Sequence, residues 1–357
     1  MPNADDIPAP MAGGGDYNRA SEVQAAGSSP ALPLFRTAAE RAPLGAPDRP
    51  LVIADYGASE GRNSMGPIGA AIGVLRRRAG ASREIAVAHT DLPENDFTTL
   101  ATLLATDPAS YLRGATGVFP AMVGRSFYEQ ILPSGSVTLG WSAWAAQWLS
   151  RVPGPIPDQI QVAFSRDAAT RKLYATRAAE DWRDFLTHRA AELVPGGRLV
   201  VLTMALDDTG DFGYRPLLEA MYATLGELVA EGLVTRAEAA AMAIPTVGRS
   251  RADLLAPFGA GGAFAGLRVE LAEVFAGEDL IWADFERDGD AQTWARRWTD
   301  FSRASVFPTL ASRIEGPDAA ARRAAFTEAL AAGMTRRVSL APARMNIPLA
   351  RLLILRE

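Results

Sequence analysis

The chain has 357 residues, of which 48% are hydrophobic and 22% charged, and its formal net charge at pH 7 is −5. It contains no cysteine and only two histidines, which excludes disulfides and thiolate chemistry and makes a metal site unexpected. The acidic balance and the lack of a basic stripe argue against nucleic-acid binding, and the lack of a long apolar run argues against a membrane span. No signal-peptide pattern is visible near residue 1, so a cytoplasmic location is expected.

Residues 1–16 are rich in alanine, glycine and proline and are expected to be disordered. Order is expected from Tyr17, with a helix beginning over residues 21–24. From residue 51, strand and helix patterns alternate, which is typical of an α/β, doubly wound, Rossmann-like sheet. Strands are predicted at residues 51–55, 84–90, 115–120, 136–141 and 198–204, and helices at residues 66–78, 96–106, 127–131 and 178–193.

The pattern becomes mainly helical after residue 204. Amphipathic helices are predicted at residues 214–231, 236–242, 249–257, 293–305 and 317–333, and strands at residues 268–275 and 350–356. We therefore expect three parts: an α/β domain over residues 17–207, a mainly helical cap with some strand over residues 208–340, and a C-terminal strand within residues 341–357 that returns to the sheet.

A glycine-rich turn after the first predicted strand is the strongest ligand-binding signal in the chain. The apolar run from Leu51 ends at Asp55, and Gly57 and Gly61 follow before a helix begins. Nucleotide-type ligands bind at this carboxyl edge of a parallel sheet, and glycines let the backbone approach a ligand closely. The turn does not contain G-x-G-x-x-G, which disfavours a nicotinamide-dependent oxidoreductase.

Asp91 ends the second predicted strand, where a carboxylate can accept hydrogen bonds from two adjacent ribose hydroxyls. The alternative is a turn acid that caps the helix beginning at Asp96; the preceding glycine turn favours the ligand interpretation. Two aromatic clusters follow, around Phe127 and around Trp144 and Trp148. Their spacing alone does not separate ligand stacking from core packing.

Taken in order, these segments resemble the SABATH family of S-adenosylmethionine-dependent methyltransferases. Its members act on the carboxyl groups of small acids such as salicylate, jasmonate and indole-acetate, and some methylate xanthine-alkaloid nitrogens. The matching segments are Tyr17…Ser21…Gln24, Asp55-x-Gly57-x-Ser59-x-Gly61-x-Asn63, Asp91-Leu92-Pro93-x-Asn95-Asp96-Phe97, Ser126-Phe127-Tyr128, Gln147-Trp148-Leu149-Ser150 and residues 192–198. The resemblance covers most of the chain from Tyr17, and the alanine- and arginine-rich composition suggests a bacterial member.

The resemblance implies that S-adenosylmethionine is the cofactor and that residues 17–207 bind it. The implied cofactor contacts are Tyr17, Ser21, Asp55, Gly57, Asn63, Asp91, Leu92, Ser126 and Phe127. Gln24 and Trp148 would hold the substrate carboxylate as the catalytic pair, and Gln147, Trp144 and Met221 would complete the substrate site. The implied partners are a small carboxylic acid and, because family members are often dimers, a second copy of the chain.

The implied reaction is an in-line displacement that forms the methyl ester of a small aromatic or apolar acid. A carboxylate with a pKa of about 4 is already ionised near neutral pH, so no general base is required. Gln147 stands where many plant members have histidine, and Ala58-Ser59-Glu60 replaces their central Cys-Ser or Ser-Ser pair, which leaves the acid unidentified. Two alternatives stay open: methylation of a nitrogen or hydroxyl on a small heterocycle or phenol, and a non-catalytic S-adenosylmethionine-binding protein.

Overall fold

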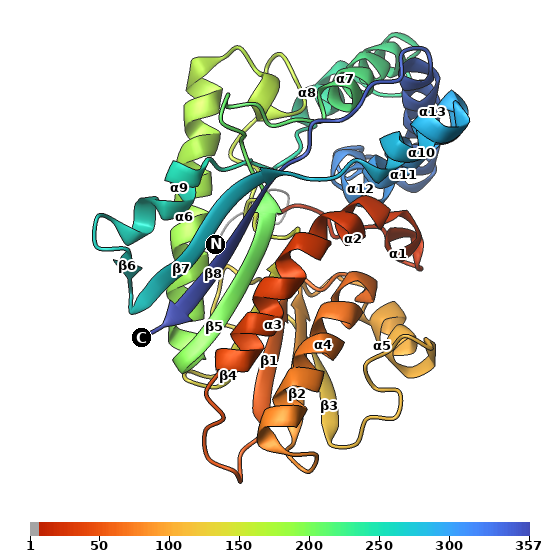
Figure 1. Ribbon diagram of the computed structural model, residues 1–357. Helices are drawn as coiled ribbons and strands as arrows, with labels where there is room; N and C mark the ends of the chain where they lie inside the picture. The colour runs from red at the N-terminus through yellow and green to blue at the C-terminus, as the bar shows by residue number, and fades with distance from the viewer. Residues whose placement is uncertain (1–6) are drawn as a thin grey trace.

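One eight-stranded sheet runs through the computed structural model, which describes residues 7–357 (Figure 1). The strand order is β3-β2-β1-β4-β5-β8-β7-β6. The strands are β1 (Leu51–Tyr56), β2 (Ile85–Asp91), β3 (Val118–Gly124), β4 (Val137–Ala143), β5 (Leu193–Met204), β6 (Ala263–Phe264), β7 (Leu267–Ala276) and β8 (Pro348–Arg356). The first five strands are parallel, whereas β8 lies antiparallel between β5 and β7. The order reverses between β1 and β4, which is the switch point where doubly wound sheets bind ligands.

Helices cover both faces of the sheet, as predicted for a doubly wound fold. The helices α3 (Leu32–Arg41), α4 (Arg62–Ala79) and α5 (Phe97–Thr106) lie over one face, and α6 (Ala168–Glu192) lies over the other (Figure 1). Successive residues of β5 alternate between the two layers: Val200 and Leu202 pack in the core with Phe35 of α3, whereas Leu199 and Val201 pack with α6. This alternation follows from the two-residue period of a strand.

The remaining helices gather beyond the carboxyl ends of the parallel strands (Figure 1). They are α1 (Asp16–Ala20), α2 (Glu22–Ser28), α7 (Arg215–Ala230), α8 (Arg236–Ala241), α10 (Leu280–Asp288), α11 (Ala291–Ser305), α12 (Phe307–Ala311) and α13 (Ala319–Ser339). Helix α13 packs against both α7 and α11, and α1 packs against α11. The short α9 (Arg251–Leu255) instead packs near β7. None of the helices in residues 7–357 is long and apolar enough to cross a membrane.

Several predicted elements differ from the structure. The predicted helix at residues 127–131 is wrong, because this segment forms a turn rather than a helix. Helix α6 begins at Ala168, ten residues before the prediction, because Asp167 caps it by accepting a hydrogen bond from the Thr170 amide. The helices α3 and α10 were not predicted. Residues 1–6 of the expected disordered segment lie outside the described residues, whereas the Ala12 amide donates to the Ala304 carbonyl.

A buried ion pair explains why residues 125–132 form a fixed turn. Arg189 and Glu192 are fully buried at the end of α6 and join through two hydrogen bonds of 2.8 and 2.9 Å. Arg189 donates to the carbonyls of Phe127 and Glu129, and Glu192 accepts from the amides of Ile131 and Leu132. The turn's backbone groups are therefore satisfied by side chains instead of by a helical ladder.

Replacing Glu192 by glutamine is expected to destabilise the fold by about 3–5 kcal/mol, because it leaves the buried Arg189 without a counter-charge. The free energy of unfolding in urea measures this. Glu129→Gln is the matched control, since its ion pair with Arg125 is exposed and contributes about 0.2–1 kcal/mol. Equal losses for the two variants would contradict the role given to the buried pair.

Candidate active site

A cavity of about 620 Å³ lies between the carboxyl edge of the sheet and the cap helices. This volume is within the usual range for a site that binds a small molecule. Its walls come from the loops that follow β1 to β4, from α2, α7 and α11, and from residues 7–11. Of the fourteen site residues predicted from the sequence, eleven line the cavity; the other three are Ser21, Asp55 and Asn63.

Asp91 joins the two loops at the switch point of the sheet. Its carboxylate accepts hydrogen bonds from the amide of Ser59, at 2.7 Å, and from the amide of Leu92, at 2.8 Å. Enclosure by the protein raises the pKa of Asp91 to about 6, against the opposing effect of these two amides. Asp96, not Asp91, caps α5 by accepting from the Thr99 amide. The helix-cap interpretation of Asp91 is therefore wrong.

The glycine turn after β1 brings bare backbone to the cavity wall. Gly57 lines the cavity and has a φ of 85°, and a Cβ atom at this position would overlap the Cβ of Ala145. Only glycine meets both conditions, because positive φ and close approach each disfavour a side chain. Ser59, two residues later, lines the cavity with a buried Oγ that has no hydrogen-bond partner in residues 7–357.

Asp55 faces away from the cavity, into the layer between β1 and α4. Its Oδ2 lies 2.8 Å from Nδ1 of His89, and Nε2 of His89 lies 2.8 Å from the Tyr111 hydroxyl. All three side chains are buried. This hydrogen-bonded series of three side chains links β1 to β2. The geometry does not favour the predicted cofactor contact of Asp55, which stays a prediction.

Ser21 and Asn63 lie behind the cavity wall rather than in it. The Ser21 hydroxyl donates to Oδ1 of Asn63 over a long 3.4 Å, which connects the start of α2 with the first turn of α4. Their direct contact with the cofactor also remains a prediction. The arrangement supports a role in placing α2, which carries Gln24.

Glu60 has a structural role in the Ala58-Ser59-Glu60 segment, which stands where many plant SABATH members have a Cys-Ser or Ser-Ser pair. Its buried carboxylate accepts from the amides of Gly15 and Asn18, at 2.6 and 2.9 Å, and so holds the N-terminus of α1. A carboxylate at a helix N-terminus is favourable because of the exposed amides and the helix dipole. Helix α1 carries Tyr17 into the cavity wall, where burial and the charge of Asp91 raise the pKa of the Tyr17 hydroxyl.

Ser126 and Phe127 lie on the turn that Arg189 and Glu192 hold, and both line the cavity. The amide of the preceding Arg125 donates to the Asp91 carbonyl at 2.7 Å, so this turn is also tied to the end of β2. The Phe127 ring packs on Tyr128 and Phe185, with ring centroids 4.7 and 5.9 Å apart. One edge of Phe127 is therefore fixed in the core while the side chain still borders the cavity.

Gln24 and Trp148 line the cavity from two different elements, α2 and the loop after β4. Gln24 is 4% exposed, and its Oε1 has no partner in the part of the chain that the structure describes. Trp148 is half-buried, and its contacts use the backbone: its amide donates to Ala145 and its carbonyl accepts from the Tyr128 hydroxyl. The amide of Gln24 and the indole N–H of Trp148 are thus available to a ligand.

Gln147 lines the cavity, but both ends of its amide are already engaged. Its Nε2 donates to the Trp144 carbonyl at 2.7 Å, and its Oε1 accepts from the Thr203 hydroxyl at 3.0 Å. These bonds fix the loop that carries Trp144 and Trp148 to β5. Substrate contact by Gln147 remains a prediction, and its two internal bonds do not favour it.

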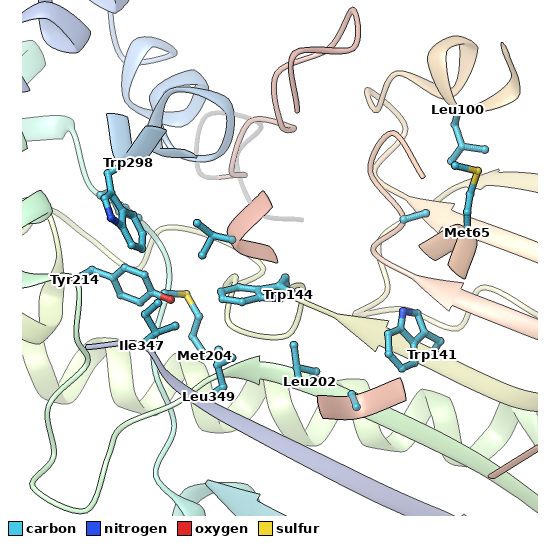
Figure 2. Packing of buried hydrophobic residues seen from close by; sticks show 14 of the residues in the cluster. Met65, Leu100, Trp141, Trp144, Leu202, Met204, Tyr214, Trp298, Ile347 and Leu349 are labelled. Atoms are coloured by element: carbon cyan, nitrogen blue, oxygen red, sulfur yellow. The ribbon is translucent and has the colours of Figure 1, made fainter. Parts of the chain in front are cut away.

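The cap end of the cavity is apolar. Trp144, Met204 and Tyr214 lie together there, with Leu202 and Leu349 packed beneath (Figure 2). The other large apolar residues of this end are Phe212, Leu217, Leu218, Met221, Ile244, Phe301 and Val306. Arg125 is the only lysine, arginine or histidine among the described lining residues.

Sequence reasoning missed several of these wall residues. Phe212, Tyr214 and Phe301 lie in or beside predicted helices, where an apolar pattern does not reveal which side chains border a cavity. Residues 7–11 also line the cavity, although the composition predicted disorder there. The signal that could have indicated this was the cluster of Ile7, Pro8 and Met11.

Comparison with known proteins places the chain in a family. A family model described as SAM-dependent carboxyl methyltransferase matches residues 9–337. The O-methyltransferase acrG of Aspergillus aculeatus is 34% identical over 76% of this chain and 72% of its own length. Methyltransferase LUC1 of Fusarium is 32% identical over 69% of this chain, and the match spans 65% of its own length, just under two thirds.

A plant relative and a solved structure agree with this. The indole-3-acetate O-methyltransferase 1 of Arabidopsis thaliana is 28% identical over 70% of this chain and 71% of its own length. The fold matches that of loganic acid methyltransferase, solved with SAH, at a TM-score of 0.78 and 22% identity over 98% of this chain and 99% of that one. The chain belongs to the family of S-adenosylmethionine-dependent carboxyl methyltransferases, the SABATH family.

Proposed function

We propose that this protein methylates the carboxylate of a small, largely apolar acid and releases the methyl ester. The observation that carries the proposal is one cavity with two different ends: Asp91 and the glycine turn at one, and two neutral side chains that carry N–H donors, Gln24 and Trp148, beside an apolar chamber at the other. When bound, S-adenosylmethionine supplies a methyl group on a positively charged sulfur.

The residues at the sheet edge fit this cofactor. Asp91 would accept hydrogen bonds from the ribose hydroxyls, since each of its oxygens keeps a free lone pair beside the single amide it already binds. Gly57 offers bare backbone, and the unpartnered Ser59 hydroxyl can bond a polar group of the ligand. Leu92 and Phe127 provide apolar surface for a base.

At the other end, Gln24 and Trp148 would each donate a hydrogen bond to the carboxylate of the acid. Both donors are neutral, so they orient the anion without the strong ion pair that an arginine would form and that would weaken it as a nucleophile. The acid is ionised at neutral pH, and the chain needs no base to activate it. Its contribution is then to position the nucleophile and to exclude water from the apolar chamber.

The two main parts of the chain would have different roles. Residues 17–207 would hold the cofactor, and residues 208–340 would close over the acid through α7 and α11. A homodimer, a cytoplasmic location and a bacterial source remain predictions that rest on the composition and the family resemblance.

A panel of aromatic and aliphatic acids, incubated with labelled S-adenosylmethionine, is expected to yield methyl esters. Mass spectrometry of the products identifies them, and mild alkali should hydrolyse an ester but not an N-methyl group. Products labelled on nitrogen or on a phenol oxygen would instead support the alternative acceptors. Cofactor binding with no product from any acid would indicate a non-catalytic protein.

Asp91→Ala is expected to abolish measurable binding of S-adenosylmethionine, because it removes the acceptor at the end of β2. In the unaltered protein, affinity should fall about tenfold per pH unit below pH 6, since binding requires the ionised form of a carboxyl whose pKa is about 6. Calorimetry from pH 5 to 8 measures both effects.

The raised pKa of Asp91 also determines how the free energy of unfolding changes with pH. Because the folded-state pKa lies above the ordinary value of 3.8, the folded ligand-free protein takes up the proton first. It is therefore expected to gain stability as pH falls from about 7 toward 5. Glu84→Ala is the control for cofactor binding: this exposed acid precedes β2 at the amino edge of the sheet, opposite Asp91, and its removal should leave cofactor affinity unchanged. Undiminished affinity in Asp91→Ala would disprove the cofactor assignment.

Gln24→Leu and Trp148→Phe each remove one donor while keeping most of the side-chain volume. Each is expected to lower kcat/KM for a confirmed acid about 10- to 100-fold, since a hydrogen bond to a charged group contributes about 1.5–3 kcal/mol. Affinity for S-adenosylmethionine should not change. Trp282→Phe, in α10 and outside the cavity, serves as the control. Full activity in both donor variants would refute this placement of the carboxylate.

A further inference from the structure

Backbone strain is concentrated at the cavity wall. In residues 7–357, four non-glycine residues have a φ in the left-handed region: Ser59, Trp144, Tyr214 and Ala265. The first three line the cavity, and each has a buried polar atom without a hydrogen-bond partner in that part of the chain. Bulky residues rarely adopt this conformation, and such outliers gather at functional sites. Tyr214 is the one that no predicted role accounts for.

The surrounding backbone fixes the strained conformation of Tyr214. Its φ is 58°, and its amide donates to the Asn346 carbonyl at 3.1 Å. The preceding Gly213 also has a positive φ, and a Cβ atom there would overlap that same carbonyl. Tyr214 is the N-cap residue of α7: its carbonyl accepts from the amides of Leu217 and Leu218, while its side chain makes no capping bond. The backbone of Tyr214 therefore starts the helix, and its ring, which takes no part in capping, lies in the cavity wall.

Aromatic neighbours lock the ring itself. It stacks on Phe301, with an interplanar angle of 9° and centroids 6.0 Å apart, and contacts Trp298 edge-on at 6.2 Å. Figure 2 shows the Tyr214 hydroxyl directed toward Met204 and the region facing Trp144. The side chain is 2% exposed, so the hydroxyl has a fixed position in the apolar chamber.

A phenylalanine would pack equally well in such a place, yet the chain has a tyrosine. Buried tyrosine hydroxyls normally have a hydrogen-bond partner, and leaving one unpaired is costly. Burial raises the pKa of this hydroxyl, which keeps it a neutral donor. The chamber around it is formed by Met204, Leu217 and Leu218, which offer no strong acceptor. The charge of Asp279 also raises the pKa of the hydroxyl, but the Asp279 carboxylate accepts from the amides of Trp282 and Met345. A molecule that enters the cavity can therefore supply the partner.

We propose that Tyr214 is a specificity-determining residue that donates a hydrogen bond to an oxygen on the apolar part of the acid, away from its carboxylate. The inference rests on the proposed function and narrows it. The substrate class is then an acid with an apolar body and a remote hydroxyl or carbonyl oxygen, rather than a plain hydrocarbon acid. A site built around such a bond rejects analogues that lack the oxygen, because its polar group is left unpaired.

Pairs of straight-chain acids with six to twelve carbons, with and without a hydroxyl on the terminal carbon, test the proposal. The unaltered protein should prefer the hydroxylated member at one chain length or more, by at least about tenfold in kcat/KM. Tyr214→Phe should lower kcat/KM for that acid about tenfold and leave the plain acid within about twofold. Calorimetry with S-adenosylhomocysteine present should show the same change in Kd.

Tyr222→Phe is the matched control, because Tyr222 lies on the same helix but is exposed and outside the cavity. Tyr222→Phe should leave kcat/KM unchanged for both the hydroxylated and the plain acid. A preference below about threefold at every chain length in the unaltered protein would overturn the inference, whether or not Tyr214→Phe folds. Equal losses for both members of a pair would show that the ring only packs. Failure of the proposed function looks different: no acid of either kind would yield an ester.

Discussion

The buried pair of Arg189 and Glu192 is the interaction on which the ligand-binding edge of the sheet depends. Besides holding the turn at residues 125–132, Glu192 accepts from the Tyr56 hydroxyl at 2.6 Å, and the Arg189 guanidinium lies over the Tyr56 ring. Tyr56 is the last residue of β1, directly before Gly57. One ion pair at the end of α6 therefore fixes both the glycine turn and the turn that carries Phe127. Such a pair adds specificity of conformation because its many bonds are satisfied in a single arrangement.

Other carboxylates around the cavity, buried or partly buried, likewise hold loops that lack regular structure. Asp91 ties the loop after β1 to the loop after β2, Glu60 holds α1, and Asp55 orients His89. Each acid binds donors that would otherwise be left unpaired between a sheet and a cap. All three acids hold the backbone or a side chain in place, and among them only Asp91 also lines the cavity.

The sequence predicted the parallel strands well because their apolar runs are short and bounded by turn residues, as in Leu51–Asp55. It failed at residues 127–131, where the partners that hold the turn lie about sixty residues away in α6 and leave no local pattern. The family resemblance brought together Gln24 and Trp148, which no periodicity would have paired. The sequence did not predict the role of Tyr214 for a different reason. Its strained φ is fixed by a hydrogen bond to Asn346, far along the chain, and a helical pattern gives no sign of such a bond.

The electrostatics of the cavity connect its two ends. Among the lining residues in the described chain, Arg125 is the only cation, and it lies on the turn next to Asp91, with its guanidinium paired to the exposed Glu129. A carboxylate entering the apolar chamber would lose water and find only neutral donors on the protein, which is costly without an opposite charge nearby. The positive sulfur of the cofactor, when bound, would supply the compensating charge. An acid-binding site without its own cation would thus be complete only when the other end of the cavity is occupied.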